Sequence, residues 1–128
     1  MLAGTDGLRL SLAGAQDKLP VVFDGGRVGL PMNGTPSTHI MKPAIRSLEG
    51  SVINEAFSLE LAGAMGLPVA KPVILNAAGE QTLLVQRYDR VTDASGNTQR
   101  VHQEDFCQAL GVLSETKYQN EGGLGFTD

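Results

Sequence analysis

Glycine and proline divide this chain into short apolar segments, and this division limits the fold more than any other feature. The 128 residues include sixteen glycines and six prolines, and glycine alone exceeds its average share of about 7%. One longer segment, residues 51–65, spaces its apolar residues as a helix does. The other apolar segments are short and bounded by turn residues. The pattern predicts a single α+β domain with short strands, tight connections and few helices.

Alternating or β-branched apolar residues predict most of the elements as strands. The predicted strands are residues 8–12, 18–23, 27–30, 38–42, 71–76 and 81–89. Asp24-Gly25-Gly26 is typical of a hairpin turn, and residues 99–102 are expected to close another small hairpin. Pro20 predicts that part of its strand lies at an edge or at a position without a ladder hydrogen bond.

Two helices are expected. Ser51 is predicted to cap the first helix, which runs to about Met65 and ends at Gly66. Its apolar stripe is predicted to consist of Ile53, Phe57, Leu61, Ala64 and Met65. The second helix begins near residue 103, with Glu104 and Asp105 in its first turn, and ends at Gly111.

Composition argues against several classes of function. The net charge is −4 without a basic cluster, which argues against nonspecific binding of nucleic acid or of an anionic membrane. Cys107, the single cysteine, excludes an internal disulfide and is expected to be a buried apolar residue. His39 and His102 are too far apart to suggest a metal site. The N-terminus lacks a signal peptide pattern and no long apolar run is present, so a reducing, cytoplasmic setting is expected.

The segment from Ser11 to Lys18, SLAGAQDK, joins two apolar segments through small residues. A backbone built from Ala13, Gly14 and Ala15 can approach a ligand closely, and successive free N–H groups can face an anion such as phosphate. A β-turn whose small residues merely avoid a clash is the alternative. The segment by itself leaves both interpretations open.

Lys42 follows Ile40 on one face of a predicted strand. If that face is the core, the ammonium needs a carboxylate or a ligand anion, because a lone buried charge is costly. The alternative is a solvated lysine at a strand end. On the following helix, Glu60 falls inside the predicted apolar stripe and Glu55 nearly opposite it, so helix spacing alone favours Glu60 as the partner of a buried Lys42.

Six blocks in this order resemble the HipA family of bacterial toxin kinases: SLAGAQDK, TPSTHIMKP, SVINE, VQRYDR, QEDFCQALG and KYQNEGG. The resemblance runs from about Leu10 to Phe126. It implies a protein-kinase-like N-lobe: an antiparallel sheet of about five strands, an αC-like helix and a second, C-terminal helix. Residues 1–112 would form this domain, and 113–128 would begin the connection to a catalytic lobe. The GxGxxG of common eukaryotic-type kinases is absent.

The resemblance also implies an ATP site. Its phosphate loop would be SLAGAQDK, with contacts from Ala13, Gly14, Ala15, Gln16 and Lys18. Ser11 matches a serine that can be autophosphorylated in the family. Such a phosphate adds about −1.5 to −2 of charge and would repel the phosphates of ATP.

The resemblance assigns roles to residues beyond the loop as well. Lys42 matches the ATP-binding lysine, and Glu55 matches the acid that opens the αC-like helix, so the resemblance favours Glu55 where spacing favours Glu60. Glu55 is chosen, because the helix could be packed on both sides, with Val52, Leu59 and Ala62 on its second face. Gln86 and Tyr88 match hinge positions whose backbone meets adenine, and Asp89 matches a ribose-binding acid. The family often has an acidic residue at the position of Gln86; this departure should cost little because main chain makes the contact.

The activity implied is transfer of the γ-phosphate of ATP, with Mg²⁺, to a serine or threonine of a protein. For this family the resemblance suggests an aminoacyl-tRNA synthetase as substrate and a HipB-like helix-turn-helix antitoxin as partner. The family's catalytic aspartate, its asparagine and its Mg²⁺-binding aspartate would lie beyond Asp128, so no catalytic or metal residue is predicted here and this piece alone is expected to be inactive. The alternative is a noncatalytic module that binds nucleotide or contacts the antitoxin.

Overall fold

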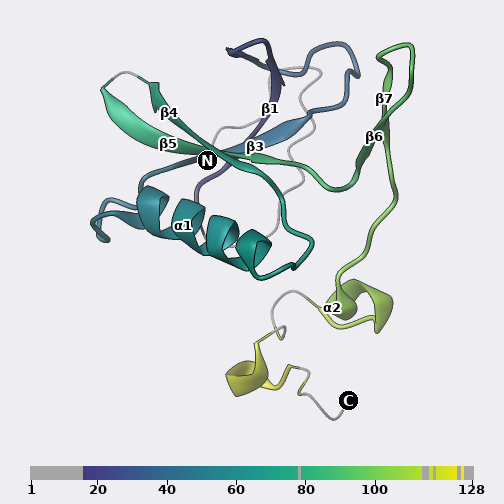
Figure 1. Cartoon of the computed structure of the whole chain (residues 1–128). Helices are drawn as coiled ribbons and strands as arrows, with labels where there is room; N and C mark the ends of the chain where they lie inside the picture. The colour runs from purple at the N-terminus through teal and green to yellow at the C-terminus, as the bar shows by residue number, and fades with distance from the viewer. Residues whose placement is uncertain (1–15, 78, 114–115, 117, 124, 126–128) are drawn as a thin grey trace.

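In a computed structural model of the chain, the residues described are 16–77, 79–113, 116, 118–123 and 125. Figure 1 shows a curled sheet with one long helix, α1, along one face. The β6–β7 hairpin and the short helix α2 lie beyond one end of this layer (Figure 1). The architecture is α+β, which confirms the predicted fold class.

The central sheet is antiparallel throughout and has the strand order β2-β1-β3-β5-β4. Its strands are β1 (Leu19–Asp24), β2 (Arg27–Gly29), β3 (His39–Pro43), β4 (Pro72–Ala77) and β5 (Glu80–Gln86). A separate hairpin consists of β6 (Arg90–Thr92) and β7 (Thr98–Arg100). The helices are α1 (Ser51–Ala64), α2 (Phe106–Ala109) and a 3₁₀ turn at Gln119–Glu121.

Each strand predicted within the described residues is present, whereas the predicted strand at 8–12 lies outside them. The largest shift is at the end of β5, which stops at Gln86 instead of Asp89. There the Arg87 N–H donates to the Thr38 carbonyl (3.0 Å), and the chain then leaves the ladder. The predicted hairpin turn is also confirmed: Gly25 and Gly26 have φ values of 53° and 85°, the positive values that a two-residue hairpin turn favours.

Pro20 occupies the kind of position that the sequence predicts. It lies opposite Ile40 of β3, whereas β2 pairs only with Val22–Asp24 of β1. Among the described strands, the side of β1 away from β3 is therefore uncovered at Pro20. A residue without a backbone N–H is tolerated at such an edge.

The ends of α1 confirm one prediction and correct another. Gly66, with φ of 86°, follows the last turn, and Leu67 N–H donates to the Ala62 carbonyl (3.1 Å), as in a Schellman motif. The sequence predicts Ser51 as the N-cap, but the cap is Gly50 and no side chain caps this end. The Ser51 hydroxyl instead accepts from the Ile45 N–H at 2.9 Å. The Ser51 hydroxyl oxygen is therefore bonded to the preceding loop and does not cap the helix.

The predicted apolar stripe of α1 is wrong. Val52 (4% exposed) and Ala56 face the sheet and pack against Leu83 of β5. The predicted stripe is exposed at Ile53 (46%), Phe57 (63%), Leu61 and Met65. The helix carries apolar residues on two faces, and helical spacing alone does not tell which one the sheet covers.

A pair of truncations tests this orientation of α1. Val52→Ala is expected to lower the free energy of unfolding by about 2 kcal/mol, because it removes two buried carbons and leaves a cavity. Ile53→Ala deletes a larger side chain but should cost only about 0.5 kcal/mol, because that side chain is half exposed. Urea unfolding followed by circular dichroism measures both. A greater loss at Ile53 would contradict the orientation.

The second helix is shorter than predicted. It spans only Phe106–Ala109, and Asp105 is its N-cap rather than part of its first turn. Asp105 and Gln108 form a reciprocal capping box, with hydrogen bonds of 2.7 and 2.9 Å. Cys107 is partly rather than fully buried. No helix in the described part of the chain has the length and apolar character needed to cross a membrane.

Candidate functional site

An ion pair joins the central sheet to α1. Lys42 Nζ lies 2.5 Å from Glu55 Oε1, and the two side chains are 22% and 32% exposed. Glu55 is therefore the partner of Lys42, and the choice of Glu60 from helix spacing is wrong because Glu60 lies on the exposed side of the helix. At this exposure the pair adds at most about 1 kcal/mol to stability. Its main effect is to fix the position of the ammonium.

Strand register explains why Lys42 points toward α1. Lys42 lies opposite Leu83, and Ile40 lies opposite Val85. Residues directly opposite each other in an antiparallel pair share a face, and Leu83 is the residue that packs on α1. The face of β3 that carries Ile40 and Lys42 is thus the helix-covered face, as its alternation predicts.

The segment after β5 leaves polar backbone open. Tyr88 is 81% exposed, and its backbone N–H and C=O form no hydrogen bond within the described residues. The Gln86 N–H donates to the Lys71 carbonyl at 3.3 Å. Gln86 lies opposite His39, three residues from Lys42 on β3. This spacing is about 10 Å, comparable to the distance between a nucleobase and the phosphates of one nucleotide.

Asp89 follows this segment as a buried anion. Arg87 donates two hydrogen bonds to its carboxylate, from Nε to Oδ1 (2.8 Å) and from Nη2 to Oδ2 (2.7 Å). Arg90 Nη1 lies 2.8 Å from Oδ2. The Arg87 hydrogen bond is the main cause that lowers the pKa of Asp89 below its usual 3.8, against an opposing effect of burial. The carboxylate is therefore charged at neutral pH.

The site predicted from the sequence includes Asp89 but neither Arg87 nor Arg90. The signal is present in VQRYDR, where two arginines flank one aspartate within four positions. A carboxylate offers about four acceptor positions; two hydrogen bonds from Arg87 and the ion-pair contact with Arg90 use three of them. One acceptor position, on Oδ1, is left without an arginine partner.

Part of the predicted phosphate loop lies outside the described residues, namely Ser11, Ala13, Gly14 and Ala15. Gln16 and Lys18 are described, and both are partly buried just before β1. Leu19 pairs with Met41, the neighbour of Lys42. The C-terminal end of this segment therefore reaches the end of β3 that carries Lys42.

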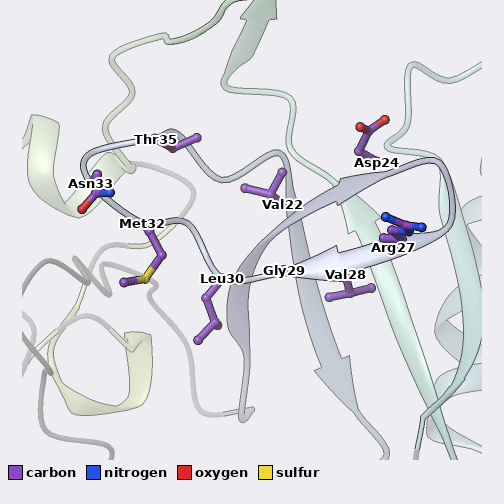
Figure 2. Close-up of a pocket in the computed structure, with 9 residues that line it drawn as sticks. All are labelled: Val22, Asp24, Arg27, Val28, Gly29, Leu30, Met32, Asn33 and Thr35. Carbon is purple, nitrogen blue, oxygen red and sulfur yellow. The ribbon is translucent and has the colours of Figure 1, made fainter.

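A separate hollow of about 460 Å³ lies at the β1–β2 hairpin and the loop that follows it. Figure 2 shows Leu30 and Met32 on one side of it, with Asp24 and Arg27 at the hairpin turn. None of the predicted nucleotide contacts lines this hollow. In the described residues, no group of three or more His, Cys, Asp or Glu side chains is arranged to hold a metal ion.

His39 lies on the other face of β3 from Lys42. Its ring meets Phe23 edge to face, with centroids 5.2 Å apart, and its Nδ1 lies 2.8 Å from Thr38 Oγ1. Burial lowers the pKa of His39 below 6.5. The folded protein therefore keeps this imidazole neutral at a pH where the unfolded chain protonates it.

This difference predicts a pH dependence of stability. Below the unfolded pKa of about 6.5 the unfolded state binds more protons, so the free energy of unfolding should fall as the pH drops through that value toward the folded pKa of His39. Urea unfolding at pH 7.5 and pH 5.5 measures the change. His39→Gln should reduce it. An unchanged slope in His39→Gln would contradict the assignment.

The chain is similar to several known proteins. A family model described as HipA-like C-terminal domain matches residues 10–128. The putative kinase Y4mE of Sinorhizobium fredii is 55% identical over 128 residues, which are 100% of this chain and 30% of that protein. The serine/threonine-protein kinase toxin HipA of Shewanella oneidensis is 35% identical over 118 residues, 91% of this chain and 27% of that protein.

A solved structure shares the fold. It is the complex of HipA, HipB and operator DNA from Shewanella oneidensis MR-1, with a TM-score of 0.75 and 32% identity over 98% of this chain and 29% of the matched chain. The chain thus spans about 30% of the length of the curated relatives it matches. With nearly all of its residues covered by the family model, the chain belongs to the HipA-like C-terminal domain family.

Proposed function

We propose that this chain is the ATP-binding portion of a HipA-like serine/threonine protein kinase toxin of a toxin–antitoxin system. The observation that carries the proposal is the ion pair between Lys42 of β3 and Glu55 of α1. In protein kinases a lysine on the third strand pairs with a glutamate of the following helix, and both must be in place for phosphoryl transfer.

Lys42 has the chemistry that the phosphates of ATP require. Its ammonium has three donors, of which Glu55 takes one, so two remain for phosphate oxygens. The contact with Glu55 restricts the lysine side chain to one position. The loop that contains Ser11, Ala13, Gly14, Ala15 and Gln16, together with Lys18, would hold the same phosphates through its backbone. A phosphate on Ser11 would repel them and act as an off switch.

The adenosine end of the nucleotide would lie at the segment after β5. The open backbone groups of Tyr88 and the carbonyl of Gln86 would meet adenine. Ile40 and Val85, paired across β3 and β5 on the face of Lys42, offer apolar surface between the two ends. The remaining acceptor position of Asp89 would receive one ribose hydroxyl.

Catalysis itself is proposed for a longer polypeptide. The resemblance assigns the catalytic aspartate, an asparagine and the Mg²⁺-binding aspartate to sequence beyond Asp128, with residues 1–112 as the N-lobe-like domain and 113–128 as the start of the connection. When bound, Mg²⁺ would neutralise developing charge on the phosphates. The proposed partners are a HipB-like antitoxin and a protein substrate, which the resemblance suggests is an aminoacyl-tRNA synthetase, in the cytoplasm.

An NMR titration tests the nucleotide site directly. Adding ATP to the ¹⁵N-labelled chain is expected to shift the amide signals of Lys42, Glu55 and Tyr88 with millimolar affinity, because only half of a cleft is present. Inorganic sulfate at the same ionic strength is the control and should leave Tyr88 unchanged. Shifts confined to the β1–β2 hairpin would contradict the proposed site. Binding of ATP without phosphate transfer by any longer polypeptide would favour the noncatalytic alternative.

A further inference from the structure

Arg90 connects the segment after β5 to the loop before β3. Its Nε donates to the Ser37 carbonyl at 2.7 Å, and its Nη1 donates to the Asp89 carbonyl at 2.7 Å. Nη1 also lies 2.8 Å from Asp89 Oδ2, and the Arg90 side chain is only 9% exposed. A single buried guanidinium thus joins two segments that are 53 positions apart.

Two more contacts run between the same parts of the chain. The Arg87 N–H donates to the Thr38 carbonyl at 3.0 Å, and Arg100 Nη2 donates to the Gly34 carbonyl at 3.1 Å. Ser37 is itself buried. Residues 34–38 are therefore attached at three points to the segment that runs from the end of β5 through β7.

By strand register, the attachment lies beyond Gln86, next to the proposed adenosine end of the site and on the side away from Lys42. Ser37 lies two residues before β3, which carries Lys42, and Asp89 directly follows the exposed Tyr88. Two buried arginines share one carboxylate, and such a group is costly unless its hydrogen bonds are made. Every buried side-chain nitrogen and oxygen in the described residues has a partner. Each buried nitrogen and oxygen of the cluster thus has at least one partner, which favours a single geometry.

We propose that Arg90 is a positioning residue of the nucleotide site, an inference that rests on the proposed function. By holding Asp89 and its neighbours against Ser37, Arg90 fixes the adenosine-binding segment relative to β3. It touches neither the phosphates nor Lys42. Loss of Arg90 should therefore weaken binding of the adenosine part of ATP and spare binding of its phosphates.

Three ligands separate these contributions: ATP, adenosine and tripolyphosphate. NMR titration of the chain is expected to show that Arg90→Gln weakens ATP and adenosine by the same factor, about tenfold, while tripolyphosphate binds as before. Lys42→Met should do the opposite, weakening ATP and tripolyphosphate but not adenosine. Arg90→Lys keeps the charge beside Asp89 but loses the planar guanidinium that also reaches Ser37. Its affinities for ATP and adenosine should therefore lie between those of the unchanged chain and those of Arg90→Gln. Arg46→Gln, at an exposed loop position, is the control.

The outcomes distinguish three cases. If the unchanged chain binds neither ATP nor adenosine, the proposed function itself fails. If it binds both and folded Arg90→Gln binds adenosine equally well, the positioning role is overturned. A loss shared by all three ligands in proportion to the unfolded fraction would show only a structural role and would also overturn it. If Arg90→Gln does not fold, the same comparison of the three ligands is made with Arg90→Lys.

Discussion

Lys42→Ala is expected to lower ATP-dependent phosphate incorporation by about 10²–10³-fold in a longer polypeptide that joins this chain to the family's catalytic residues. The ammonium is the charged donor that the structure fixes beside α1 through Glu55. Without it, the phosphates lose a positioned positive charge, and positioning with charge stabilisation provides most of the catalysis in phosphoryl transfer. Transfer of label from γ-labelled ATP to the protein, including to Ser11, measures the effect.

Two further variants make this result specific. Glu55→Gln keeps a hydrogen bond acceptor but removes the negative charge, so it should lower incorporation less than Lys42→Ala does. Lys71→Ala removes an exposed lysine just before β4 and should leave incorporation unchanged. Lys42→Ala should also cost no more than about 1 kcal/mol of stability, because the pair is partly solvated. Retained incorporation in folded Lys42→Ala would contradict the role given to Lys42.

The second large effect is expected on stability. Asp89→Asn should lower the free energy of unfolding by about 3–5 kcal/mol, because it leaves two buried guanidinium groups without a counter-charge. The side chains of Arg87, Asp89 and Arg90 are at most 10% exposed, so water does not replace the lost carboxylate. Domains of this kind are stable by about 5–15 kcal/mol, and the change is a large part of that. Urea unfolding followed by circular dichroism measures it.

Two controls accompany Asp89→Asn: the same substitution at an exposed aspartate, and the dependence of its effect on pH. Asp24→Asn, in the exposed hairpin turn, should leave stability nearly unchanged. The pKa of Asp89 is lowered in the folded state from 3.8, so its contribution is present above that pH and is lost as the pH falls through the folded pKa. The difference between Asp89→Asn and the unchanged chain should shrink below about pH 3.8. A constant difference down to pH 2 would contradict the ionic explanation.

The candidate site shows where sequence reasoning succeeds and where it fails. Alternation along residues 38–42 correctly placed Lys42 with Ile40 on an inward face, because strand periodicity is a local property of the backbone. Helix spacing then selected Glu60, since it treated the larger apolar residues of α1 as the buried face. The order of sequence blocks selected Glu55, and the ion pair confirms that residue as the partner. Its role toward ATP stays a prediction.

Local sequence predicts the elements whose geometry depends on neighbouring residues. The turn at Gly25 and Gly26, the end of α1 at Gly66 and the alternation of β3 all follow from local backbone preferences. Local sequence does not predict which face of α1 is covered or that Arg90 reaches Ser37. Both depend on contacts between segments far apart in the chain, and their free energies come from burial and desolvation, which exist only once the sheet and helix have packed.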